Sequence, residues 1–228
     1  MRIKKRIIIF SLLGIIILGG LYTERKFHNA NYRNKQAQKH IGQLIVNDEI
    51  EDGDLIFQTS LSRQSLAIQH ATNSKYSHCG IIYKKGKNFF VFEAVQPVKL
   101  TPLDKWIERG KGGKFVIKRL KNAGKILTPS VLNKMKEEGE QLIGRDYDLS
   151  FEWSDDKIYC SELIWKIYKR AAGIELGKLQ KLKDFNLKDH AVEKIMKERF
   201  GNNIPLDETV ISPAAIFDSK LLITIKSN

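Results

Sequence analysis

The sequence predicts an α+β domain with a small antiparallel sheet packed against helices, preceded by an apolar N-terminal segment. Residues 77–95 hold two apolar strand patterns on either side of Gly86, which is typical of a β-hairpin. Residues 130–143 and 161–172 carry apolar side chains at helical spacing. No internal repeat is visible, so we expect these elements to share one core.

The composition is that of a globular protein. The chain has 228 residues, of which 42% are hydrophobic and 29% charged. Its two cysteines cannot form a disulfide framework, so the fold must be held by its core. The five histidines and two cysteines show no metal-ligand spacing. We therefore expect neither a structural zinc site nor a cofactor.

The formal net charge of +13 is concentrated near the N-terminus, where residues 1–48 hold nine basic and two acidic side chains. Basic proteins often bind nucleic acid, but the chain has no recognition motif, and its aromatic residues lie in apolar patterns rather than among lysines. We expect no nucleic-acid partner. A basic flank beside an apolar segment is more simply explained by attraction to anionic lipid headgroups.

Residues 1–22 are predicted to be a transmembrane anchor or a signal segment. The apolar run Ile7–Tyr22 follows the basic start MRIKKR. As a helix it would span roughly 24 Å, slightly less than a hydrocarbon core of roughly 30 Å. A cleaved signal peptide has a similar pattern, but no A-x-A-like site follows the run. We favour an uncleaved single-pass anchor, with the N-terminus inside and the rest of the chain outside the membrane.

Residues 23–48 are polar and basic and are predicted to be a tether, and residues 49–228 form the folded domain. Asp52-Gly53 is a turn signal before a buried strand at 54–57. Residues 62–72 suit a helix capped by Ser62. The hairpin strands are expected at 77–83 and 88–95.

The second half of the domain is predicted to be mainly helical. A strand is expected at 114–120, followed by the helix at 130–143 and the helix at 161–172, which Gly173 ends. Residues 176–203 are rich in lysine and partly helical in pattern. Residues 209–225 are apolar enough to dock on the core.

Cys160 lies where the helix at 161–172 begins. Leu163, Ile164 and Ile167 recur at helical spacing, and Cys160 falls on the same stripe. One interpretation is a core thiol, because free cysteine is among the most buried residue types. The other is a nucleophile, because unpaired N–H groups and the positive dipole end of a helix N-terminus stabilise a thiolate. This stretch alone leaves both interpretations open.

A nucleophile needs a base, and His78 at the start of the first hairpin strand is the best placed. A lone histidine there is more often an ordinary core or edge residue. Glu93 strengthens the hypothesis, because a carboxylate in the apolar strand FFVFEAV is costly unless it is paired. If Tyr83 pairs with Asn88 across a four-residue loop, His78 faces Glu93 on one side of the sheet. Glu93 would then orient the imidazole as the third member of a triad.

Six short motifs in the folded domain carry a family resemblance. They are GDLIF (53–57), YSHCGI (76–81), FEA (92–94), GRDYDLSF (144–151), YCSELIW (159–165) and SPAAIFDS (212–219). They resemble motifs of the YiiX/YebB-like branch of the NlpC-type cell-wall peptidases, which are circularly permuted papain-like enzymes. The motifs run from about Gly53 to Ser219, nearly the whole of the predicted soluble part. Their distinctive feature is their order, with histidine and acid first and the cysteine later on a helix.

The resemblance implies a permuted papain-like fold and a thiol hydrolase in which His78 deprotonates Cys160 and Glu93 supports His78. It also implies an oxyanion held by the N–H of Cys160, with Tyr159 in the pocket or at the oxyanion site, although packing explains Tyr159 equally well. Cys79 departs from the usual aliphatic residue. Because strand side chains alternate, it points away from the face of His78, and we interpret it as a core residue. Asp54, Asp146 and Asp148 are explained at least as well by turns and caps as by substrate binding.

The predicted function is therefore a membrane-tethered cysteine peptidase or amidase. Its substrate is expected to be a peptide or acyl amide, and a peptidoglycan-derived peptide is favoured because the domain is expected to face the cell wall. Two alternatives stay open: a lipid-directed thiol acyltransferase or esterase, and a catalytically silent binding module that uses the same cleft. A pure binding site would not need Cys160, His78 and Glu93 together. The sequence predicts no oligomeric state.

Overall fold

The computed structural model describes residues 31–32, 35, 39 and 49–228. The predicted anchor at 1–22 and most of the predicted tether at 23–48 lie outside the described residues. No helix within the described ranges is both long and apolar enough to cross a membrane.

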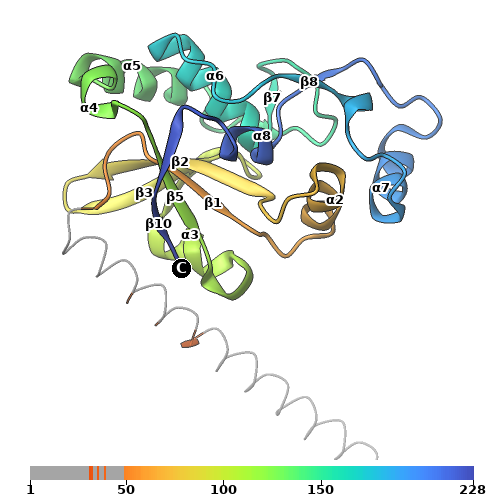
Figure 1. Ribbon diagram of the computed structural model, residues 1–228, viewed down its shortest axis with the longest axis horizontal. Helices are drawn as coiled ribbons and strands as arrows, with labels where there is room; N and C mark the ends of the chain where they lie inside the picture. The colour runs from red at the N-terminus through yellow and green to blue at the C-terminus, as the bar shows by residue number, and fades with distance from the viewer. Residues whose placement is uncertain (1–30, 33–34, 36–38, 40–48) are drawn as a thin grey trace, which may run out of the picture.

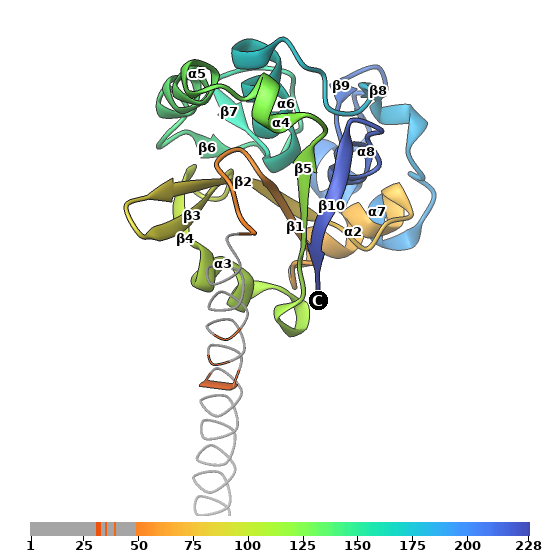
Figure 2. The ribbon, with the colours of Figure 1, turned by 60° about the vertical axis from the view of Figure 1, so that its left-hand side comes forward.

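Six of the described strands form one antiparallel sheet in the order β10-β5-β1-β2-β3-β4. Figure 2 shows β10, at the C-terminus, lying beside β5 as the edge strand of the sheet. The strands of this sheet are β1 (Leu55–Gln58), β2 (His78–Lys85), β3 (Asn88–Glu93), β4 (Lys99–Pro102), β5 (Val116–Leu120) and β10 (Leu222–Ser227).

Helices cover both faces of this sheet, and short strand pairs lie outside it. The helices are α2 (Arg63–Thr72), α3 (Leu103–Arg109), η1 (Lys111–Gly113), α4 (Ala123–Ile126), α5 (Pro129–Glu140), α6 (Cys160–Ala172), η2 (Leu182–Asp184), α7 (His190–Phe200) and α8 (Pro213–Phe217). The short strands are β6 (Asp146–Tyr147), β7 (Lys157–Ile158), β8 (Gln180–Lys181) and β9 (Thr209–Val210), which pair as β6 with β7 and β8 with β9.

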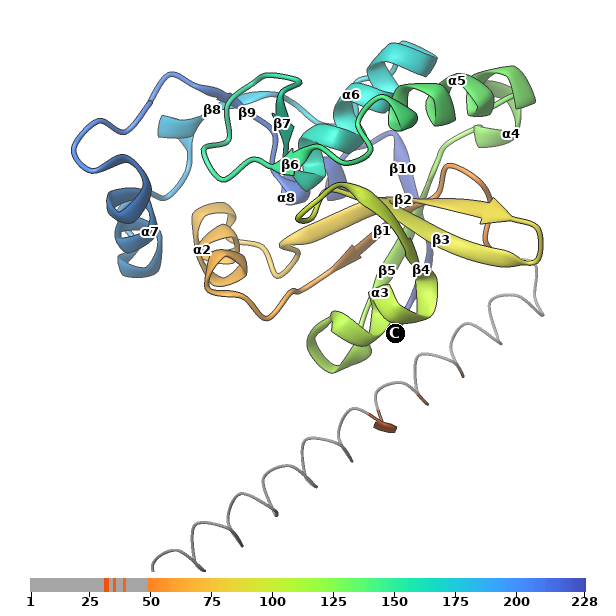
Figure 3. The same cartoon turned by 180° about the vertical axis from the view of Figure 1, so that it is seen from behind.

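The sheet separates two apolar clusters, because the side chains of each strand alternate between its faces. On one face Phe57, Cys79 and Ile81 pack with α5 and α6, whose buried residues include Met135 and Leu163. The opposite face packs against α3 through a second cluster that contains Trp106. Figures 1 and 3 show α5 and α6 on one side of the sheet and α3 on the other.

A third apolar cluster joins α2 to α7 beyond the end of the sheet. Ala67 of α2 contributes to it, as do Val192, Ile195 and Met196 of α7. The N-terminus of α2 forms as predicted, because Ser62 Oγ accepts the N–H of Ser65 at 3.0 Å. The two helices lie side by side in Figures 1 and 3.

Most predicted elements are present, including the hairpin, the helices that begin at Arg63 and Cys160, and the strand before Leu120. The helix α6 ends where Gly173 takes a positive φ of 71°. The elements that were not predicted include β4 and α3, which follow the hairpin directly, and the short strands β6 to β9. The C-terminal segment docks on the core as expected, and does so partly as the strand β10.

The predicted hairpin register is wrong by two residues. Tyr83 pairs with Phe90 rather than with Asn88, which instead pairs with Lys85. The chain reverses within two residues rather than four, because Gly86 takes a positive φ of 62° that favours a tight turn. A shift of two residues preserves the face of every side chain, whereas a shift of one would have reversed it.

Candidate active site

Cys160 is the first residue of α6 and lies where this helix packs on β2. Its side chain is buried, and it belongs to the main apolar cluster. The first N–H groups of a helix have no partner within the helix, and the helix dipole is positive there. The Glu162 carboxylate accepts the backbone N–H of Tyr159 at 3.4 Å and thereby fixes the entry into the helix.

The buried carboxylate of Glu93 holds His78. His78 Nε2 lies 2.6 Å from Glu93 Oε2, and Glu93 itself is fully buried. The other carboxylate oxygen accepts Thr101 Oγ1 at 2.5 Å, and Arg109 donates to both oxygens at 2.6 and 2.7 Å. Burial would raise the pKa of Glu93, but the hydrogen bond and charge of His78 and the charge of Arg109 lower it to about 2. The carboxylate is therefore ionised at neutral pH.

The hairpin brings these two side chains together diagonally rather than directly across the sheet. Glu93 follows Phe92, which pairs with Ile81, so Glu93 lies opposite Gly80, two residues from His78 and on the same face. A Cβ at Gly80 would lie 2.4 Å from Val91 Cγ1 and 3.5 Å from Glu93 Cβ. Glycine at this position therefore keeps β3 close enough for the diagonal contact.

The imidazole is also packed on its ring face. Trp106 of α3 stacks on His78 with ring centroids 5.9 Å apart and an interplanar angle of 24°. Trp106 is fully buried, so the imidazole lies against a fixed surface. Packing and the Glu93 hydrogen bond together restrict how the ring can turn.

The pKa shifts of Cys160 and His78 favour charge separation between the two side chains. Burial disfavours a charged imidazole, but hydrogen bonds with Cys160 and Glu93 outweigh it and raise the pKa of His78 to about 9. A hydrogen bond from Cys79, together with the hydrogen bond and charge of His78, outweighs burial and holds the pKa of Cys160 well below that of an ordinary thiol. Both shifts favour a thiolate paired with an imidazolium over a neutral thiol and imidazole.

Cys79 combines a core position with a contact at the site. It is fully buried in the main apolar cluster, as expected for a core residue. Strand alternation predicted a packing role alone, yet Cys79 also contributes to lowering the pKa of Cys160. Burial and this contact raise the pKa of Cys79 well above its usual value, so it stays a neutral donor. Because strand side chains alternate, the sequence already placed Cys79 on the face opposite to that of His78, and this face packs against α6.

Tyr159 lies in the wall of a cavity that Cys160 also lines. Its ring packs edge-on against Phe151 with centroids 5.2 Å apart, and its hydroxyl accepts the N–H of Ile211 at 3.1 Å. The predicted place in the pocket fits this position. The hydroxyl is engaged at Ile211, and the contacts of Tyr159 give no support to an oxyanion role.

The three aspartates near the family motifs have structural partners. Asp54 is buried and pairs with Arg119 at 2.7 Å. Asp148 accepts the N–H of Ser150 at 2.7 Å, which is a turn contact. Asp146, at the edge of the short strand β6, accepts a hydrogen bond from Gln96 at 2.5 Å. These contacts agree with the turn and cap roles considered for them.

Comparison with known protein families identifies the family to which the sequence belongs. The family described as "permuted papain-like amidase enzyme, YaeF/YiiX, C92 family" matches residues 49–226. The chain belongs to this family. Its members are papain-like cysteine amidases or peptidases, so the chain is a cysteine hydrolase at the family level. The predicted enzyme class and the predicted permuted papain-like fold of the domain are confirmed, whereas the predicted N-terminal anchor helix is not.

Two relatives are 47% identical in sequence to this chain over the aligned residues. One is the "Uncharacterized protein YiiX" of Escherichia coli strain K12, over 175 residues that make up 77% of this chain and 85% of that protein. The other is a crystal structure, titled as that of metalloprotein yiiX from Escherichia coli O157:H7, with a TM-score of 0.75 over 79% of this chain and 98% of that one. Among the residues described for the present chain, no group of three or more His, Cys, Asp or Glu side chains could hold a metal ion.

The first prediction concerns the reactivity of the two thiols. An ordinary thiol of pKa about 8.5 is only about 1% thiolate at pH 6.5, whereas Cys160 should already be ionised there. Iodoacetamide at pH 6.5 should therefore label Cys160 at least about tenfold faster than Cys79. Peptide mass spectrometry over time measures both rates.

A pH series separates ionisation from mere access. The labelling rate of Cys160 should be nearly constant from pH 6.5 to 8, and after unfolding in urea both thiols should react alike. A rate at Cys160 that rises tenfold per pH unit over this range would show an unactivated thiol.

Proposed function

We propose that this chain hydrolyses an amide bond through a Cys160–His78–Glu93 triad. The observation that carries the proposal is the position of His78, which hydrogen-bonds to the buried Glu93 carboxylate and whose pKa is raised by its interactions with Cys160 and Glu93. A buried carboxylate that orients an imidazole next to a thiol at a helix N-terminus is the arrangement that thiol acyl transfer requires.

The reaction begins when the Cys160 thiolate attacks the carbonyl carbon of the amide. The carbonyl oxygen becomes an oxyanion, which the N–H groups of the first turn of α6 can stabilise. His78 then gives its proton to the amide nitrogen, the C–N bond breaks, and the amine leaves. The acyl group remains on Cys160 as a thioester.

Water completes the cycle. The neutral imidazole of His78 takes a proton from water as the oxygen attacks the thioester, the C–S bond breaks, and a carboxylic acid is released. Glu93 remains ionised throughout, since it lies between Arg109, Thr101 and His78. Its task is to orient the ring and to stabilise the imidazolium.

Membrane attachment is also part of the proposal. It rests on the apolar run Ile7–Tyr22 and on the basic residues that flank it. The domain would then lie outside the cytoplasm. A peptidoglycan-derived substrate remains a prediction, which rests on the domain lying outside the cytoplasm.

The triad predicts non-additive kinetics. Cys160→Ala and His78→Ala should each lower kcat/KM by about 10³-fold or more, and the double variant should be no worse than either, because the two residues act as a unit. Glu93→Gln should fold, keep part of the activity and require a higher pH for Cys160 alkylation, since it removes the charge that favours the imidazolium.

Circular dichroism of each variant controls for folding. Additive losses in the double variant would mean that Cys160 and His78 act separately. Unchanged kinetics in Glu93→Gln would leave a Cys-His dyad.

The attachment is tested by fractionation. The full chain should sediment with membranes and resist both high salt and carbonate, while a chain beginning at Asn47 should be soluble. Release of the full chain by salt alone would show that the basic residues, rather than an inserted helix, hold it at the surface.

A further inference from the structure

A hollow in the surface of the domain lies between the β2–β3 hairpin, β4 and the C-terminal part of α5. This hairpin hollow encloses about 720 Å³, and its lining residues all differ from those of the cavities beside Cys160 and His78. The buried rings of Tyr83 and Phe92 line it, with their centroids 6.4 Å apart. A Cβ at Gly139 of α5 would lie 3.1 Å from the Phe92 ring, so this glycine lets the helix come close to the hairpin.

Two exposed apolar side chains line the hairpin hollow. Leu100 of β4 is 41% exposed, and Ile143, which follows α5, is 50% exposed. Their segments are joined, because the carbonyl of Val98 accepts the N–H of Gly144 at 3.0 Å and its N–H donates to the carbonyl of Arg145 at 2.9 Å. Exposed apolar side chains with a polar rim are typical of a surface that contacts a partner.

Lysine side chains accompany these two apolar residues. Lys84 and Lys85 at the end of β2 and Lys136 of α5 line the hairpin hollow, and Lys87 lies in the turn that follows Lys85. Both Lys85 and Lys87 are exposed and without a carboxylate partner in the part of the chain that the structure describes. Glu140 is the acidic residue among the lining residues, so positive charge predominates at this surface.

The start of the folded domain is attached to the same surface. Asp52 accepts the backbone N–H of Lys84 and, at 3.0 Å, a hydrogen bond from Lys136 Nζ. Asp52 comes just after the basic segment at 23–48, which the apolar run Ile7–Tyr22 precedes. If that run is inserted in a bilayer, the chain enters the domain beside the hairpin hollow.

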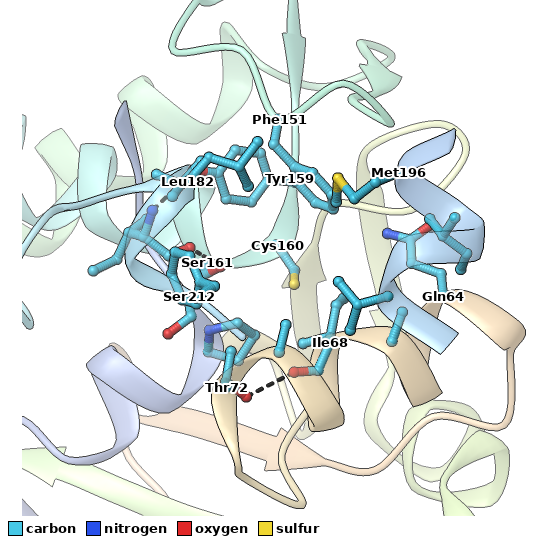
Figure 4. Close-up of a pocket in the computed structure, with 18 of the residues that line it drawn as sticks. Gln64, Ile68, Thr72, Phe151, Tyr159, Cys160, Ser161, Leu182, Met196 and Ser212 are labelled. Atoms are coloured by element: carbon cyan, nitrogen blue, oxygen red, sulfur yellow. Dashed lines mark hydrogen bonds between the residues drawn. The ribbon is translucent and has the colours of Figure 1, made fainter. Parts of the chain in front are cut away.

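The catalytic pair lies at the opposite end of the domain. His78 is the first residue of β2 and Lys85 the last, so roughly 23 Å of strand separates them. Figure 4 shows Cys160 close to Ile68 of α2 and Met196 of α7. In Figures 1 and 3 these two helices lie at the other end of the domain from the turn between β2 and β3. A partner at the hairpin hollow would therefore leave the catalytic pair accessible.

The chemistry of this surface fits a lipid bilayer better than a soluble polyanion. A polyanion would pair with the lysines but would gain nothing from the exposed side chains of Leu100 and Ile143. At a bilayer, lysines attract the anionic headgroups while apolar side chains enter the boundary between headgroups and acyl chains. The stem of each lysine also covers apolar surface while its ammonium group stays in water.

We propose that the surface formed by the hairpin turn, Leu100 and Ile143 docks on an anionic lipid bilayer and directs the catalytic end of the domain away from it. The inference rests on the membrane attachment proposed above, and it adds a lipid contact made by the folded domain itself. Lys85 and Lys87 contact the headgroup phosphates, and Leu100 and Ile143 enter the interface. Substrate then reaches His78 from the aqueous side.

The test measures backbone hydrogen exchange of the full chain in two kinds of lipid nanodisc, one of phosphatidylcholine alone and one with roughly 30% phosphatidylglycerol. Exchange in residues 84–88 and 140–145 should be at least about threefold slower in the anionic nanodisc, because the docked bilayer excludes water. Peptides from α2 and α7 should exchange alike in both. Salt at about 0.5 M should remove most of the difference by screening the charges. Equal exchange in the two nanodiscs would overturn the inference.

A matched pair of charge variants locates the contact. Lys85→Gln combined with Lys87→Gln should abolish the slower exchange in the anionic nanodisc. Lys194→Gln combined with Lys197→Gln, which changes two exposed lysines of α7, should leave it unchanged. Equal effects of the two double variants would contradict the assignment to this surface, since total charge alone would then explain the result.

A second pair of variants tests the apolar contact. Leu100→Ser combined with Ile143→Ser should reduce the difference in exchange at least about twofold. Leu206→Ser combined with Ile223→Ser, at positions that are 46% and 44% exposed elsewhere on the domain, should not. A difference that survives Leu100→Ser with Ile143→Ser would show a purely electrostatic surface, suited to a soluble polyanion, and would overturn the bilayer contact. Slower exchange that depends on protein concentration rather than on anionic lipid would indicate a second copy of the chain, and would also overturn it.

Carbonate extraction of membranes separates this inference from the proposed anchor. A chain that resists carbonate, but exchanges equally in both nanodiscs, would keep the anchor and overturn the docking surface. Slower exchange in the anionic nanodisc by a chain that carbonate releases from membranes would support the docking surface and contradict an inserted anchor. The alkylation rate of Cys160 should be the same in all four double variants, which confirms that each one is folded.

Discussion

The buried carboxylate of Glu93 is the constraint on which the site depends. A charge in this position is tolerable only because Thr101, Arg109 and His78 each bond to it. These partners come from β4, α3 and β2, so the carboxylate ties together three elements on one face of the sheet. The orientation of His78 follows from this arrangement, and His78, together with Cys79, lowers the pKa of Cys160.

Cys160 and His78, the proposed catalytic pair, lie on opposite faces of the sheet. Glu93 and Trp106 hold His78 from the face that α3 covers, whereas Cys160 belongs to α6, which packs on the other face. His78 is the first residue of β2, and Cys160 is the first residue of α6, which packs on β2. The Cys160 thiol on one layer and the His78 imidazole on the other therefore come together only if α6 packs on the sheet in this position. The packing of the core therefore determines whether these two side chains can interact.

The sequence was sufficient for the hairpin, for most of the longer helices and for the face on which each hairpin residue lies. Alternation along β2 and β3 placed His78 and Glu93 on one face even though the predicted pairing was wrong by two residues. The exact register depended on Gly86 and its tight turn. Thr101 and Arg109 were not predicted as partners of Glu93, because they belong to β4 and α3, which no pattern indicated. Cys79 was assigned to the correct face, but its contact with Cys160 required knowing how α6 packs.

The most direct test of this account is an NMR titration of the His78 imidazole in the protein labelled with ¹³C and ¹⁵N. Hydrogen bonds with Cys160 and Glu93 predict that the ring titrates with a pKa of about 9, above the ordinary value of 6.5. The midpoint should fall in Glu93→Gln, because the carboxylate that favours the charged ring is lost. A midpoint at or below 6.5 in the intact protein would contradict the account, since Glu93 would then not support an imidazolium at neutral pH.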